Sequence, residues 1–167
     1  MTGAAYAQSP LGFGIKGGFP LTDAYTQSAI VNAATNGKNY IVGPFAEIRL
    51  PFGLGVEGDA LYHPVSLTNL TSTRATWEFP ILAKYRFSLP VPLIKPLIEA
   101  GPAFRAHSSD LPNLTGNGFT FGGGVEFKLP VIRLSSDVRY TRWKSAGTGT
   151  NAFPNANQVE LLFGIGF

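Results

Sequence analysis

The chain of 167 residues contains no cysteine, which excludes disulfide bonds, thiolate metal sites and thiol nucleophiles. Charged residues make up only 14% of the sequence, against roughly 25% in ordinary soluble domains. The net charge of +3 is small and the basic residues are scattered, so nucleic acid is not expected as a partner. No run of about 18 apolar residues occurs, and a membrane-spanning helix is therefore excluded.

The final segment, VELLFGIGF, alternates between apolar and polar or small side chains. Alternate side chains of an extended strand point to opposite faces, so this segment would have one apolar and one polar face. At the end of a soluble chain, such a strand would fray and would offer an unpaired edge for aggregation. Its apolar face is therefore expected to meet something other than water. The residues of that face are Val159, Leu161, Phe163, Ile165 and Phe167.

A period of two also runs through most of the preceding sequence. In WEFPILAKYRF, every second residue from Trp77 to Phe87 is apolar, whereas three of the five residues between them are charged. A helix would mix these two sets around its circumference. The pattern predicts eight strands, at 11–19, 39–50, 54–66, 74–88, 96–108, 117–129, 132–144 and 158–167.

The connections between these segments alternate between two kinds. The short ones contain proline and lie at 51–53, 90–95 and 130–131. The longer ones are rich in Asn, Thr, Ser and Gly and lie at 20–38, 67–73, 109–116 and 145–157. An even number of strands of about ten residues, with short turns at one end and long loops at the other, is typical of a transmembrane β-barrel. We therefore expect an all-β, eight-stranded antiparallel up-and-down transmembrane β-barrel, with both termini and the short turns at the periplasmic end.

The N-terminus carries a weak export pattern. Ala5-Tyr6-Ala7 matches the small-x-small end of a secretory signal whose basic and apolar regions are not in the sequence. Residues 1–7 are accordingly expected to be a signal-peptide remnant, and residues 8–167 the barrel domain.

In each expected strand, one set of alternate positions is mainly apolar and the other mainly polar or small; we call these sets the apolar and the polar parity. The polar parity carries 16 of the 23 charged residues, eight acidic and eight basic. Equal numbers of both signs predict a charge network inside a side-chain-filled lumen, because unpaired charges there would be costly to desolvate. Basic partners are expected above all for the acids Glu57, Asp59, Glu78, Glu99 and Glu126. The full set is Lys16, Glu47, Arg49, Glu57, Asp59, Glu78, Lys84, Arg86, Glu99, Arg105, Glu126, Lys128, Arg133, Asp137, Arg139 and Glu160.

A soluble eight-stranded barrel of the lipocalin type would place the apolar face inside. Eight strands enclose just enough space for side chains or one small ligand, and the many aromatic residues of the apolar parity would overfill it. On a lipid-facing surface they meet no such limit and can form two interfacial belts. The membrane barrel is therefore favoured.

Three prolines fall inside the expected strands. Pro44, Pro80 and Pro102 cannot donate a hydrogen bond to a β-ladder. Each is expected to mark a bulge or a position near the outer rim.

The C-terminal alternation that closes on Phe167 is similar to the assembly signal by which the insertion machinery recognises outer-membrane barrels. Over residues 8–167, the chain resembles the small OmpA/OmpX-type eight-stranded barrels. The segments WEFPILAKYRF and EAGPAFR are similar to those of bacterial outer membrane protein beta-barrel domains. The resemblance implies a monomer in the bacterial outer membrane, with outer-membrane lipid and, during biogenesis, the assembly machinery as partners. It does not decide the role, because such barrels include structural proteins, adhesins and enzymes.

Catalytic and metal sites have few candidates. His107 and Ser109 resemble the His-x-Ser arrangement of outer-membrane lipid A deacylases, with histidine as base and serine as nucleophile, although the flanking residues depart from that motif. The only other histidine is His63, and no triplet of metal ligands is expected around either histidine, so neither a metal nor a cofactor is predicted. The favoured role is structural or surface-interactive without catalysis. A lipid-modifying enzyme and a narrow solute pore are the alternatives.

Overall fold

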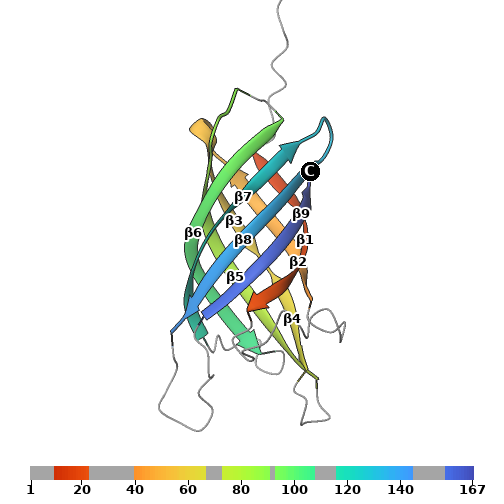
Figure 1. Ribbon diagram of the computed structural model, residues 1–167, viewed down its shortest axis with the longest axis vertical. Coiled ribbons are helices and arrows are strands. Elements are labelled where there is room, and N and C mark those ends of the chain that lie inside the picture. Colours follow the sequence, from red (N-terminus) through yellow and green to blue (C-terminus); the bar gives the residue numbers. More distant parts are fainter. Residues whose placement is uncertain (1–9, 23–39, 67–72, 91–92, 108–115, 145–156) are drawn as a thin grey trace, which may run out of the picture.

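The chain folds into a closed antiparallel β-barrel, as the period of two predicts (Figure 1). The computed structural model describes residues 10–22, 40–66, 73–90, 93–107, 116–144 and 157–167. No helix in these ranges is long and apolar enough to cross a membrane. The elements are β1 (Leu11–Thr22), β2 (Ile41–Arg49), the 3-10 turn η1 (Pro51–Gly53), β3 (Leu54–Asp59), β4 (Leu61–Ser66), β5 (Thr73–Arg86), β6 (Ile94–His107), β7 (Gly116–Lys128), β8 (Arg133–Trp143) and β9 (Asn157–Gly166).

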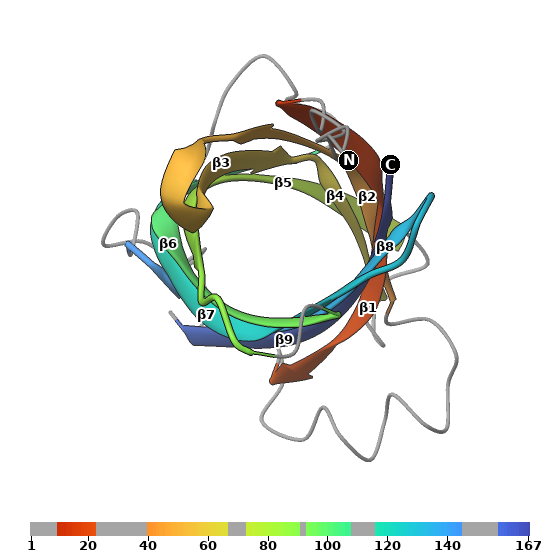
Figure 2. The ribbon, with the colours of Figure 1, turned by 90° about the horizontal axis from the view of Figure 1, so that it is seen from above.

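The C-terminal strand β9 closes the barrel. It pairs with β8 on one edge and with β1 on the other, and β1 in turn pairs with β2, so the strands form a complete ring (Figure 2). The amide of Phe167 continues this pairing beyond β9 by donating to the carbonyl of Phe13 at 2.9 Å. VELLFGIGF thus closes the barrel against β1, and both edges of this apolar strand are covered.

The expected strand 54–66 is interrupted at Ala60, which separates β3 from β4. Pro44 of β2 lies opposite: the Ala60 amide donates to the Pro44 carbonyl at 3.0 Å, but Pro44 has no N–H with which to return the bond. The pairing with β2 keeps the same register on both sides of the interruption. Because of this, β3 and β4 are two halves of one barrel strand, and the barrel has eight strands.

Pro80 and Pro102 leave a similar gap between β5 and β6. The pairing stops at Pro80↔Ala103 and resumes at Ala83↔Ala100, with no change of register. The expectation of a bulge or a rim position is wrong for both prolines, since they lie near the middle of their strands, which keep their alignment and omit only the bonds near a residue that cannot donate.

The two faces of the barrel differ sharply. Its exterior carries exposed apolar side chains from every part of the ring, among them Phe13, Ile81, Phe121 and Ile165. Charged side chains occupy the interior. This arrangement is the reverse of a soluble barrel and suits a lipid environment.

The two ends of the barrel also differ. The turn end, at the top of Figure 1, carries η1, the β7–β8 turn, the start of β1 and the end of β9. Phe52 and Gly53 make the η1 turn with positive φ values of 64° and 82°. The opposite end, where β4 ends and β9 begins, is called the loop end below. The expected signal remnant at 1–7 and most of the expected long loops lie outside the described residues.

Candidate functional site

The structure buries thirteen of the sixteen charged residues of the polar parity, whereas the other three, Arg49, Lys128 and Arg133, are half-buried. The buried ones are Lys16, Glu47, Glu57, Asp59, Glu78, Lys84, Arg86, Glu99, Arg105, Glu126, Asp137, Arg139 and Glu160. Their ion pairs divide into three clusters along the barrel axis.

The central cluster consists of Lys16, Glu57, Asp59, Lys84, Glu99, Asp137 and Arg139. Arg139 is its hub: Nη2 donates to Oε1 of Glu57 at 2.9 Å, and the same guanidinium also donates to Asp59 and Glu99. The Lys84 ammonium lies 2.8 Å from Glu57 and 3.1 Å from Glu99. Three cations thus face four carboxylates, and charge is nearly balanced within the cluster.

The turn-side cluster consists of Glu47, Arg49, Arg86 and Glu126. Arg86 donates to Glu47 and, from Nε at 2.9 Å, to Glu126, while Nε of Arg49 lies 3.3 Å from Glu47. A cavity of about 20 Å³ lies among these side chains, lined also by Glu57 of the central cluster. Such a volume holds about one water molecule, so the side chains nearly fill the lumen here.

The loop-side cluster consists of His63, Glu78, Arg105, Gln158 and Glu160. Nη2 of Arg105 donates to Oε1 of Glu78 at 2.7 Å and to Oε1 of Gln158 at 2.6 Å. Nε2 of Gln158 donates in turn to Glu160 and, at 3.5 Å, to Glu78. The amide therefore links the two carboxylates of this cluster from one side.

Two lumen aromatics were not predicted from the sequence. The ring of Trp143 lies 3.9 Å from Cζ of Arg105, and the ring of Phe45 lies 5.1 Å from Nζ of Lys16, both within the range of cation–π attraction. Gly118 makes room for the indole, because a Cβ there would lie 2.8 Å from it. The alternation along β8 could have predicted that Trp143 points into the lumen, because Trp143 lies on the same face of the strand as Arg139.

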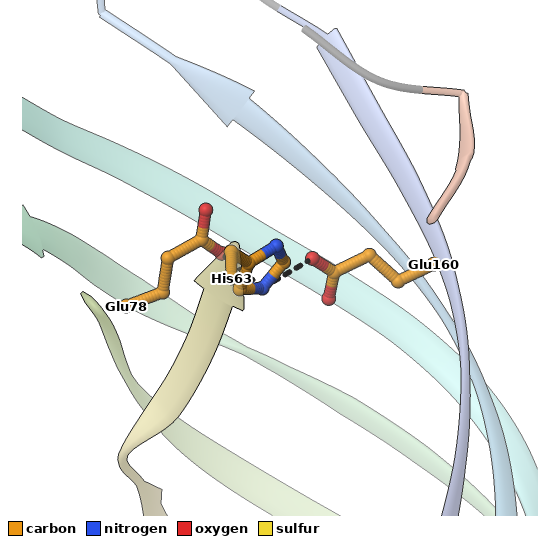
Figure 3. A group of neighbouring side chains, drawn as sticks. All are labelled: His63, Glu78 and Glu160. Carbon is orange, nitrogen blue, oxygen red and sulfur yellow. Dashed lines mark ion pairs between the residues drawn. The ribbon is translucent and has the colours of Figure 1, made fainter. Parts of the chain in front are cut away.

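The loop-side cluster also corrects an expectation about metal ligands. His63 comes from β4, Glu78 from β5 and Glu160 from β9, and their side chains converge inside the barrel (Figure 3). Nε2 of His63 lies 3.4 Å from Oε2 of Glu78 and 3.4 Å from Oε1 of Glu160. The expectation that no triplet of metal ligands gathers around a histidine is wrong, because residues up to 97 positions apart meet across the ring.

The other candidate residues are placed only in part. Only the backbone of His107 is described, and it pairs with Thr76 at the end of β6. Ser109 lies outside the described residues, so their catalytic pairing stays a prediction. In β9, the apolar face points outward, with Phe163, Ile165 and Phe167 about half exposed. Its use as an assembly signal also stays a prediction.

Comparison with known proteins agrees with this architecture. The chain is similar to Neisserial surface protein A (14% identity, 95% of this chain and 96% of that chain, TM-score 0.65) and to the N-terminal β-barrel domain of Pseudomonas aeruginosa OprF (11% identity, 94% and 96%, TM-score 0.55). It is also similar to OprG from Pseudomonas aeruginosa (13% identity, 94% of each chain, TM-score 0.52). These identities support the fold alone, and no curated protein matches the chain. The outer membrane protein beta-barrel domain matches residues 1–167, and the chain therefore belongs to that family.

Proposed function

We propose that this outer-membrane barrel is non-enzymatic and non-conducting, and that it serves a structural or surface-interaction role. Its location in the bacterial outer membrane follows from the family and from the barrels it resembles. In the proposed role, a rigid, filled barrel anchors the segments at its loop end, where a partner would bind.

The observation that carries this proposal is the bridge that Arg139 forms across the lumen. Its strand, β8, lies opposite β3 in the ring, with three strands between them on either side. Arg139 nevertheless bonds Glu57 and Asp59 of β3, so the side chains bridge the full width of the barrel. Lys16 and Lys84 fill the same layer and are also buried.

The sign of the charges also argues against a selective pore. Ion-selective constrictions are formed by rings of one charge or by backbone carbonyls. The central cluster instead mixes cations and acids that bond one another, which supports a plug that is held in place by its own charge pairs.

The distribution of carboxylates supports a non-catalytic surface. Every Asp and Glu side chain in the described ranges is buried. None of these acids can therefore orient a histidine base at the lipid-facing surface, as a lipid hydrolase requires.

Planar-bilayer recordings of the purified protein test the proposal. The wild type is expected to show no stable single-channel current. The double variant Arg139→Ala/Glu57→Ala, which removes the bridge, is expected to leak ions, whereas Arg142→Ala on the exposed face of the same strand is not. Porin-like wild-type currents that disappear on heat denaturation would contradict the proposal. So would a change in the mass spectrum of lipid A between cells with and without the protein.

A further inference from the structure

The loop-side cluster contains a set of side chains that the plug does not need. Glu78 already has a cationic partner in Arg105, whereas His63 and Glu160 have no Arg or Lys within ion-pair distance among the described residues. With a neutral imidazole, the two carboxylates and one guanidinium leave one negative charge in a buried layer. Such a charge requires a counter-ion or a proton.

The distances within this set fit a metal ion. Each carboxylate oxygen lies 3.4 Å from Nε2 of His63, and neither contact has the geometry of a hydrogen bond. Ligands about 2.0–2.1 Å from a tetrahedral Zn²⁺ are separated from one another by about 3.4 Å. The three ligand atoms all lie within 4.8 Å of one another.

The imidazole nitrogen is available for coordination. His63 is 9% exposed, and its Nε2 has no hydrogen-bond partner in the part of the chain that the structure describes. In Figure 3 the imidazole lies between the two carboxylates. A buried, unpartnered nitrogen between two acids has the arrangement of a metal-ligand set.

The surroundings hold the carboxylates in place. Arg105 binds Oε1 of Glu78 and leaves Oε2 facing His63. Gln158 donates to Glu160, and its own carbonyl is fixed by Arg105 and by Trp143, whose Nε1 donates at 3.0 Å. Outer-shell hydrogen bonds of this kind orient metal ligands and tune their affinity.

The set lies toward the loop end of the barrel. His63 lies three residues before the end of β4, and Glu160 lies three residues after the start of β9, so both are near the loop end. The central cluster lies between them and the turn end.

We propose that His63, Glu78 and Glu160 bind one divalent transition-metal cation of the Zn²⁺ type, with water completing the coordination. Imidazole is a poor ligand for Ca²⁺ and Mg²⁺, which prefer all-oxygen sites, so these cations are not expected to compete. The bound ion joins β4 and β5 to β9 across the lumen.

Calorimetric titration of Zn²⁺ into the chelator-treated, detergent-folded barrel tests this. One ion is expected to bind per chain, and millimolar Mg²⁺ is not expected to displace it. His63→Gln and Glu160→Gln should each weaken binding by at least about 100-fold, the upper end of the loss seen when only an outer-shell partner is removed. The matched controls are His107→Gln, at the other histidine, and Glu126→Gln, a buried acid of the turn-side cluster; both should bind as the wild type does.

A second measurement needs no variant of the three proposed ligands. In nitrogen NMR spectra of the folded wild type, Zn²⁺ should shift the imidazole signal that persists in His107→Gln. If the wild type did not bind Zn²⁺, the proposal would be overturned. The cluster would then be interpreted as an imidazolium that pairs with the two acids. Binding that survives His63→Gln, or that His107→Gln abolishes, would overturn it as well. These results do not depend on whether the barrel conducts.

Discussion

Replacing Arg139 with methionine is expected to destabilise the barrel strongly, because the substitution keeps an unbranched side chain but removes the cation at the centre of the lumen. Arg139 is 1% exposed and bonds Glu57, Asp59 and Glu99. The variant leaves four carboxylates of the central cluster facing two lysines. Removing one partner of a buried ion pair typically costs about 3–5 kcal/mol of unfolding free energy.

The remaining lysines place the expected loss near the lower end of that range. Glu57 and Glu99 keep contacts with Lys84 at 2.8 and 3.1 Å, and Asp59 keeps Lys16 at 3.7 Å. We therefore expect a loss of about 3 kcal/mol for Arg139→Met. Adding Lys84→Met removes both cations that contact Glu99, so the double variant should lose more than the sum of the two single losses.

Urea-dependent unfolding in lipid vesicles, followed by tryptophan fluorescence, measures these free energies. The matched control is Arg142→Met, three residues further along the same strand on the exposed face, where a change within about 0.5 kcal/mol is expected. If Arg139→Met cost no more than this control, or if the double variant were simply additive, the central cluster would not be the interaction that couples the strands.

Two further predictions concern the exterior. Phe121, which is 53% exposed near the middle of β7, should lose about 2–4 kcal/mol of unfolding free energy on mutation to arginine in a bilayer, whereas Phe121→Leu should lose much less; equal losses would argue against a lipid-facing position. Phe167→Ser keeps the backbone bond to Phe13 but removes the terminal ring, so it should slow assembly in cells more than it weakens the barrel refolded in detergent. Pulse-chase measurement of the folded fraction checks this, and equal insertion of variant and wild type would remove the targeting role.

The faces of the strands could be predicted from the sequence because they depend on local geometry. Side chains alternate in any extended strand, whatever lies beside it. The alternation of Val138, Arg139 and Tyr140 is enough to place the arginine opposite its neighbours, and the structure buries Arg139 and exposes Val138. Strand number and turn asymmetry likewise follow from the spacing of the segments, and the eight-stranded barrel is confirmed.

The partners within the lumen could not be predicted in this way. Parity gives the face of a residue but not its height in the barrel, and height depends on the registers of all the pairs around the ring. Arg139 meets Glu57 and Asp59, and His63 meets Glu160, only because those registers bring opposite strands to one level. The ligand set at the loop end therefore had no signature in any single segment.

The prolines show the same division within the sheet. The sequence alone determined that Pro44 cannot donate a backbone hydrogen bond, because this is a property of the residue itself. Only the register between β2 and its neighbour decided that Ala60 lies opposite, and that the strand is interrupted there rather than bulged. A side chain's chemistry and its face belong to one segment, whereas the atoms it meets depend on how eight segments align.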